Sequence, residues 1–159
     1  MKKALILDRD GTLIEDKNYL NNYKKIKFLK NNIRGLRNLS KNNYSFFIVS
    51  NQSGIARKLI KNEELAKINY EIKKQLLKKK IMISEIFSCI HHPIKNCKCR
   101  KPKTYFGKII LNKYKLKKKN VIMVGNSKSD YKFAKNLKIK YFNIGKKYKS
   151  ILDISQKIL

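Results

Sequence analysis

The chain has 159 residues, and its 40 Lys and Arg against 10 Asp and Glu give a formal charge of +30. A hydrophobic fraction of 42% and an aromatic fraction of 10% exclude the composition of a disordered chain. No apolar run approaches the ~20 residues that cross a bilayer, and the amino terminus has no signal-peptide pattern. We therefore expect one globular domain over residues 1–159, without membrane association.

Short apolar runs alternate with helix-period segments along the chain. In chain order, the prediction is strand 4–7, helix 33–39, strand 44–49, helix 65–76, strand 83–88, helix 106–114, strand 121–124, helix 131–137, strand 141–144 and a weaker helix 150–159. The strands are apolar enough to be buried on both faces. This alternation predicts an α/β fold, a Rossmann-like parallel sheet of about five strands with helices on both faces.

Two carboxylates, Asp8 and Asp10, directly follow the first predicted strand and precede Gly11. In proteins built on an open parallel sheet, ligands bind at the carboxyl ends of the strands. A pair at this spacing can hold a divalent cation, with one carboxylate as nucleophile and the other transferring a proton. The alternative is an ordinary Asx turn.

Two more polar clusters follow the second and fourth predicted strands. Ser50, Asn51, Gln52 and Ser53 supply hydroxyl and amide groups that can donate to phosphoryl oxygens, although such residues are also common in loops. After the fourth strand, Asn126 and Asp130 offer oxygen ligands to the same metal as Asp8 and Asp10. Asn126 or Ser127 could also cap the following helix, with Asp130 favouring its amino-terminal dipole, and the two roles are compatible.

The long connection over about 89–104 contains all three cysteines of the chain. Cys89, His91, Cys97 and Cys99 match the ligand set of a closed, structural zinc site, with His92 able to replace His91. Three cysteines this close together also favour a reducing, cytoplasmic location over a disulfide framework. Arg100 and Lys101 follow at once, and a rigid zinc loop would direct them toward the strand ends.

These clusters, in this order, resemble the haloacid dehalogenase (HAD) superfamily of phosphohydrolases. The segments DRDGTLI, VSNQSGIAR, CIHHPIKNCKCRKPK and MVGNSKSD are similar to the heptose 1,7-bisphosphate 7-phosphatases and to the related histidinol-phosphatases. The likeness extends from about residue 3 to 144. It implies a magnesium-dependent phosphatase with a structural zinc ion, which acts on a small phosphorylated sugar.

The resemblance also implies a role for each matching residue. Asp8 would form an aspartyl-phosphate, and Asp10 would serve as general acid and base. Ser50 and Lys101 would bind the phosphoryl group. Other substrate contacts would come from Asp16, Tyr19, Asn51, Gln52, Ser53 and Arg100. Magnesium would bind the Asp8 carboxylate, the Asp10 carbonyl and position 126, with Asp130 nearby.

Two departures from the family stand out. Asn126 occupies a position where the family usually has Asp, which removes one negative charge from the metal site. The segments after Asp10 and after Gly54 are too short for a separate cap domain, so we expect specificity to come from loops.

The alternatives to a heptose bisphosphate are histidinol phosphate and a nucleic-acid 3′-phosphate, which the charge of +30 would attract. A non-enzymatic alternative is a basic RNA-binding module whose catalytic site has degenerated through Asn126. Lysines are spread along the whole chain, which also fits a solvated surface without any nucleic-acid partner. We expect a monomer.

Overall fold

Five parallel strands form one sheet in the order β3-β2-β1-β4-β5, which confirms the predicted α/β fold. The structure is a computed structural model that describes residues 2–159. The strands are β1 (Lys3–Leu7), β2 (Tyr44–Asn51), β3 (Ile83–Cys89), β4 (Val121–Gly125) and β5 (Lys140–Asn143). The helices are α1 (Asn32–Lys41), α2 (Asn62–Lys78), α3 (Tyr105–Lys113), α4 (Lys128–Leu137) and α5 (Ile151–Ile158), with short 3-10 turns η1 (Tyr23–Lys25), η2 (Pro93–Lys95) and η3 (Lys118–Asn120).

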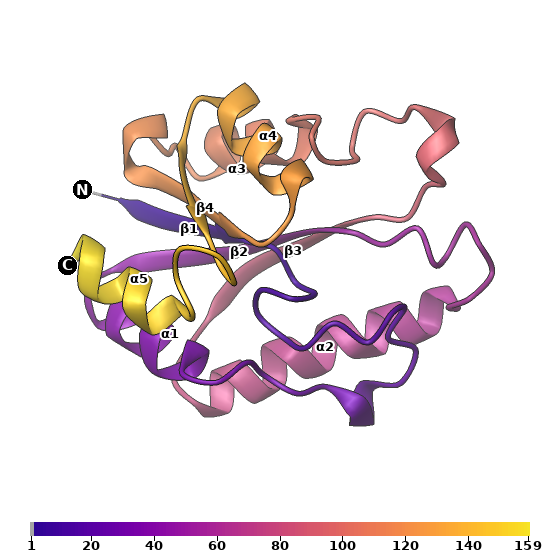
Figure 1. Ribbon diagram of the computed structural model, residues 1–159, viewed down its shortest axis with the longest axis horizontal. Coiled ribbons are helices and arrows are strands. Elements are labelled where there is room, and N and C mark those ends of the chain that lie inside the picture. Colours follow the sequence, from indigo (N-terminus) through magenta and orange to yellow (C-terminus); the bar gives the residue numbers. More distant parts are fainter. Residues whose placement is uncertain (1) are drawn as a thin grey trace.

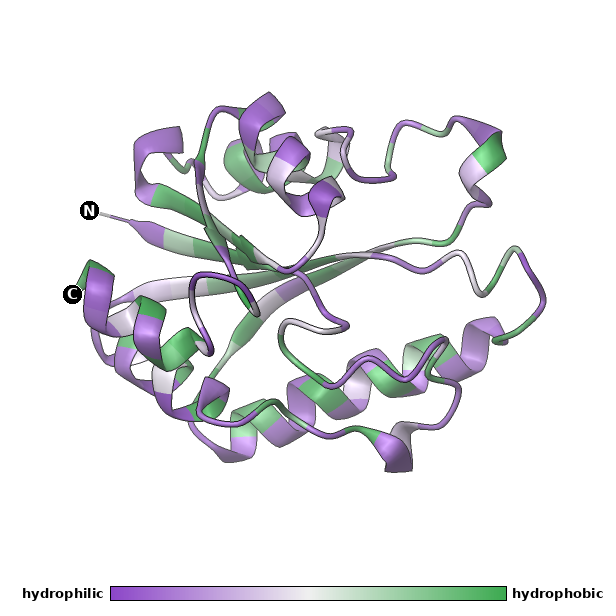
Figure 2. Cartoon of the chain, viewed as in Figure 1, coloured by the Kyte–Doolittle hydropathy of each residue, from purple (hydrophilic) through white to green (hydrophobic). Residues whose placement is uncertain are grey.

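Helices cover both faces of the sheet, with α3 and α4 on one side and α1, α2 and α5 on the other (Figure 1). Alternate residues of a strand point to opposite faces, so β1 contributes Leu5 and Leu7 to one core and Ala4 and Ile6 to the other. The strands are largely hydrophobic, and hydrophilic residues alternate with hydrophobic ones along the helices (Figure 2). Each helix therefore stays in place by burying one apolar stripe.

The expectation that every strand is buried on both faces is wrong for the two edge strands. Strands β1 and β4 are almost entirely buried, whereas β3 is only half-buried over its central five residues and β5 begins with an exposed residue. An edge strand has a neighbour on one side alone, so part of its surface faces solvent. Strand β5 also begins one residue earlier than predicted, and α4 begins three residues earlier.

Helices α1 and α5 pack closely at Gly35. A methyl group on Gly35 would lie 2.4 Å from the backbone of Ile151, so no larger residue fits without a shift of the helices. The buried side chain of Asn32 joins the same elements, because its Nδ2 donates to the Thr12 carbonyl and its Oδ1 accepts from the Ile151 amide. This contact fixes the carboxyl-terminal helix against the segment that follows β1.

The strand order determines where a ligand can bind. From β1 the chain proceeds to β2 and β3 on one side and returns to β4 and β5 on the other, so a crevice opens at the carboxyl ends of β1 and β4. Within residues 2–159 no separate cap domain covers this edge, as predicted; the 15–31 segment is a loop with a single 3-10 turn. None of the described helices is long and apolar enough to cross a membrane.

Candidate active site

Lys101 joins two carboxylates at the carboxyl edge of the sheet. Its Nζ lies 2.6 Å from Asp8 Oδ1 and 2.7 Å from Asp130 Oδ1, and it also donates to the Val49 carbonyl at 2.6 Å. Asp8 directly follows β1, Asp130 lies in the first turn of α4, and Lys101 comes from the loop after β3. All three residues are buried, so three distant parts of the sequence meet in one desolvated ion-pair cluster.

Asp130 has two functions in the local structure. Its Oδ2 accepts hydrogen bonds from the Ser127 amide at 3.0 Å and from Ser127 Oγ at 2.6 Å, while its Oδ1 accepts from Lys101. Ser127 is the amino-terminal cap of α4, so the capping alternative is confirmed with Ser127 as the cap residue. Both oxygens of Asp130 are therefore engaged by the protein itself.

The balance of charge in this cluster shifts two pKa values. Burial raises the pKa of Asp8 to about 6; the Lys101 ammonium opposes this, and the neighbouring Asp130 carboxylate adds to it. Burial alone would lower the pKa of Lys101, but the carboxylates of Asp8 and Asp130 outweigh it and raise the pKa. Two carboxylates share one ammonium, so the cluster favours a further cation.

Asn51 fixes the backbone of Lys101. Its Oδ1 accepts from the Lys101 amide at 3.0 Å and its Nδ2 donates to the Lys101 carbonyl at 3.1 Å. Both polar atoms of a side chain predicted to bind substrate are thus used inside the protein. Ser50 is buried at the end of β2, with its Oγ 3.5 Å from Ser88 Oγ.

A pocket of about 280 Å³ opens beside this cluster. It is lined by Arg9, Asp10, Asp16, Asn18, Tyr19, Leu20, Asn51, Gln52 and Ser53. Six of these residues are predicted site residues: three follow β1, and the other three lie at or just after the end of β2. Arg100 does not line the pocket; it is half-buried, and its Nη1 is buried with no partner among the described residues.

The loop that carries Asp16 has an unusual backbone. Asn18 and Tyr19 are consecutive residues with positive φ, 46° and 68°. Asp16 Oδ1 accepts from the Asn18 amide at 2.9 Å, which closes the turn, and the Tyr19 ring lies where a Cβ on Gly54 would come within 2.8 Å. Asp16, Asn18 and Tyr19 all line the pocket, so this turn forms one of its walls.

Sequence reasoning missed Arg9 as part of the site. Arg9 is 1% exposed although arginine is rarely buried, and it contacts Asp10 and Gln52. The position of Arg9 between Asp8 and Asp10 in the sequence could have indicated this contact. An arginine side chain between two carboxylates of a turn can form an ion pair with one of them.

The oxygen donors at this edge suit magnesium. Asp8 and the Asp10 backbone lie in the turn after β1, and Asn126 packs against the same turn, where its Nδ2 would lie 2.1 Å from a Cβ on Gly11. Gly11 has a φ of 73°, so the turn needs glycine for its backbone as well as for space. Carboxylate, carbonyl and amide oxygens are the ligands that a hard divalent cation prefers.

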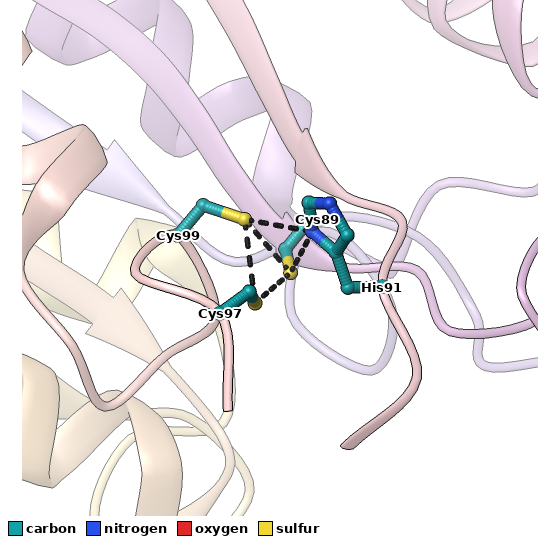
Figure 3. Close-up of side chains that lie close together, drawn as sticks. All are labelled: Cys89, His91, Cys97 and Cys99. Carbon is teal, nitrogen blue, oxygen red and sulfur yellow. Dashed lines mark hydrogen bonds between the residues drawn. The ribbon is translucent and has the colours of Figure 1, made fainter. Parts of the chain in front are cut away.

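The four predicted zinc ligands converge in the loop after β3 (Figure 3). Cys89, His91, Cys97 and Cys99 place their ligand atoms within 4.8 Å of one another. The sulfur-to-sulfur distances are 3.5, 3.1 and 3.6 Å, and His91 Nδ1 lies 3.2 Å from Cys99 Sγ. Ligands around one zinc ion at about 2.3 Å stand about 3.8 Å apart, so this cluster is compatible with a structural zinc site. His92 is outside it and accepts a hydrogen bond from the Ile94 amide.

Comparison with known proteins identifies the family. The family model described as polynucleotide kinase 3 phosphatase matches residues 3–147. The chain belongs to this family. Among curated relatives, the histidine biosynthesis bifunctional protein HisB of Legionella pneumophila is 36% identical over 148 residues, which cover 92% of this chain and 42% of that protein. The chain therefore spans less than half the length of this bifunctional relative.

Single-activity relatives match over more of their length. D-glycero-beta-D-manno-heptose-1,7-bisphosphate 7-phosphatase of Haemophilus influenzae is 33% identical over 88% of this chain and 79% of that protein. A solved structure of D,D-heptose 1.7-bisphosphate phosphatase from B. bronchiseptica, complexed with magnesium and phosphate, superimposes with a TM-score of 0.87. It covers 98% of this chain and 97% of that one at 22% identity, which confirms the HAD-like fold.

Proposed function

We propose that this chain is a magnesium-dependent phosphatase of the HAD superfamily, and that its substrate is a small sugar phosphate. The observation that carries the proposal is the bridge from Lys101 to Asp8 and Asp130 beside a pocket that Asp10 lines. A buried carboxylate held by an ammonium at the mouth of a polar pocket suits nucleophilic attack on a bound phosphoryl group.

In this mechanism a carboxylate oxygen of Asp8 attacks phosphorus, and the bond from phosphorus to the leaving oxygen breaks. Asp10 gives its proton to that oxygen. A water molecule then attacks the aspartyl-phosphate and returns a proton to Asp10, which releases phosphate and restores Asp8. Lys101 and Ser50 donate to the phosphoryl oxygens and offset their charge throughout.

Magnesium would be held by the Asp8 carboxylate, the Asp10 carbonyl and Asn126. When bound, it supplies positive charge that neutralises the phosphoryl oxygens. Asn126 is preferred over Asp130 as a ligand because Lys101 and Ser127 already occupy the oxygens of Asp130.

D-glycero-D-manno-heptose 1,7-bisphosphate, cleaved at its 7-phosphate, is the first candidate substrate. Relatives at 33% and 35% identity carry this activity in their names. The pocket supports a hydroxyl-rich substrate, since Asp16, Asn18 and Ser53 offer hydrogen-bonding groups on its walls. Arg100, the residue before Lys101, is the candidate cation for a second phosphate.

Two other phosphate esters compete for this role. Histidinol phosphate is favoured by the 36% identity to the bifunctional histidine-biosynthesis protein, and a nucleic-acid 3′-phosphate by the family description and the charge of +30. The deciding experiment compares kcat/KM for the heptose bisphosphate, histidinol phosphate and a 3′-phosphorylated oligonucleotide. The proposal expects the sugar phosphate to exceed both by at least tenfold; a faster oligonucleotide would overturn the substrate assignment.

An RNA-binding module without catalysis is the remaining alternative. RNA affinity that falls steeply between low and physiological salt, with no phosphatase activity, would support it.

We further propose a single phosphatase domain with a structural zinc loop at about residues 89–104, which works as a cytoplasmic monomer. The three cysteines are free of disulfides and gather in one cluster, which supports a reducing compartment.

A further inference from the structure

The carboxylate of Asp10 is held by two neighbouring side chains. Arg9 donates from Nε to both Asp10 oxygens, at 3.1 Å to Oδ1 and 3.0 Å to Oδ2, and its Nη2 lies 3.0 Å from Oδ2. Gln52 Nε2 donates to Oδ2 at 2.7 Å. Gln52 Oε1 accepts from Arg9 Nη2 at 2.8 Å, so the three side chains form a closed triangle, which we call the Asp10 clamp.

The two holding residues are dedicated to this contact. Arg9 is 1% exposed and Gln52 5% exposed, whereas the Asp10 side chain is 24% exposed. Within residues 2–159, the side-chain hydrogen bonds of Arg9 go to Asp10 and Gln52 alone, and its buried Nη1 has no partner. A buried guanidinium loses its hydration, so its hydrogen bonds to Asp10 and Gln52 take the place of water contacts.

The clamp treats the two oxygens of Asp10 differently. Oδ2 receives donors from Arg9 Nε, Arg9 Nη2 and Gln52 Nε2, which use its acceptor capacity. Oδ1 receives one hydrogen bond, from Arg9 Nε at 3.1 Å. The less engaged oxygen belongs to a partly exposed carboxylate that lines the pocket.

We infer that Arg9 and Gln52 are positioning residues that fix Asp10, and that Oδ1 is the oxygen that exchanges the proton. This inference rests on the proposed phosphatase function. As Asp8 bonds to phosphorus and the leaving oxygen departs, the proton on Oδ1 moves to that oxygen; when water attacks the aspartyl-phosphate, Oδ1 takes up a proton from it. A fixed carboxylate does not need to reorient in either step.

The competing explanation is that the triangle only fastens the turn after β1 to the end of β2. The two explanations differ in which substrates a clamp variant loses. An alkyl phosphate needs a proton on its leaving oxygen, whereas an aryl phosphate such as p-nitrophenyl phosphate has a good leaving group and needs little help. Purely structural damage would slow both substrates equally.

The test measures kcat/KM, which reports the first phosphoryl transfer, for an alkyl sugar phosphate and for p-nitrophenyl phosphate in Gln52→Ala and Arg9→Met. General acid catalysis contributes about 10²- to 10⁴-fold, so we expect a loss of that order on the alkyl ester and less than about tenfold on the aryl ester. Asp10→Asn should show the same selectivity. Gln75→Ala removes a similar glutamine-to-carboxylate bond on α2, to Glu71, and should change neither rate.

Equal losses of kcat/KM on both substrates, or no loss on the alkyl ester, would overturn the positioning role of the clamp. Either result would leave the proposed phosphatase function intact. A wild-type chain that is inactive on every phosphate monoester would overturn the proposed function and the clamp together. If Arg9→Met does not fold, Gln52→Ala alone decides between the two explanations. Gln52 is uncharged, and its replacement by alanine keeps the contact between Arg9 and Asp10.

Discussion

Lys101 Nζ lies 2.6 Å from Asp8 Oδ1 and 2.7 Å from Asp130 Oδ1, so one buried ammonium serves two carboxylates. In the proposed function this ammonium would bind the phosphoryl oxygens of the substrate, and without substrate it offsets the repulsion between the two carboxylates. The same contact therefore links catalysis to stability.

Replacing Lys101 by Met should lower both activity and stability. The variant leaves Asp8 and Asp130 buried without their cation. Removing one partner of a buried ion pair costs about 3–5 kcal/mol, so we expect the free energy of unfolding to fall by that amount. We expect the phosphatase rate to fall by about 10³-fold or more. Urea unfolding and steady-state kinetics measure the two effects, with Lys108→Met, an exposed lysine on α3, as the matched control.

If Lys101→Met were as stable as wild type, the ion-pair cluster would not stabilise the fold. If it were as active as wild type, Lys101 would have no role in binding the phosphoryl group.

The pH profile of kcat/KM should fall on its acid side, at a pH that depends on the magnesium concentration. Asp8 attacks only as the carboxylate, and its pKa of about 6 lies above the ordinary value of 3.8, so protonation removes the nucleophile as pH falls through about 6. Magnesium binds the ionised form, so higher magnesium should move the limb to lower pH. pH profiles of kcat/KM at low and saturating magnesium measure this, and a limb that does not move would argue against Asp8 as a ligand.

The raised pKa of Asp8 affects stability in the opposite direction: activity rises with pH, whereas the free energy of unfolding falls. A carboxyl group whose pKa is raised in the folded state contributes most below its unfolded pKa, and that contribution is lost as pH rises through about 6. Asp8→Asn should therefore unfold at a higher denaturant concentration than wild type at neutral pH without magnesium. The difference between the two proteins should shrink toward about pH 4.

Asn126→Asp should tighten magnesium binding. The substitution adds about one negative charge to a site that packs on the Asp10–Gly11 turn, and ligand charge tunes the affinity of such sites. We expect the magnesium concentration at half-maximal activity to fall severalfold. An unchanged midpoint, together with loss of activity in Asp130→Asn, would transfer the metal assignment to Asp130.

Zinc removal should reduce activity while the sheet remains folded. Cys99 lies two residues before Lys101, so loss of the metal frees the segment that carries the Lys101 ammonium. We expect one zinc per chain by metal analysis, and a chelated protein with much lower kcat but unchanged far-ultraviolet circular dichroism. Full activity in a zinc-free sample would show that the cluster does not support the site.

The fold, and the meeting of the candidate site residues at one edge of the sheet, were predictable because both depend on local patterns. Apolar runs marked the strands, and polar residues after them had to meet, since parallel strands end at one edge. Which strands form the edges depends on tertiary order, so the exposure of β3 and β5 was not predictable. The burial of Arg9 and the use of Asn51 on the Lys101 backbone arise from contacts across the chain, for which the sequence offers only proximity or composition.

The central claim is that Asp8 carries the phosphoryl group during turnover. Rapid acid quenching of the enzyme with a phosphate-labelled sugar phosphate, followed by peptide mass spectrometry, tests it most directly. The account predicts a hydroxylamine-sensitive acyl phosphate on Asp8, which disappears in Asp8→Asn together with activity. Phosphate on a different residue, or an Asp8→Asn variant that turns over substrate at the wild-type rate, would contradict it.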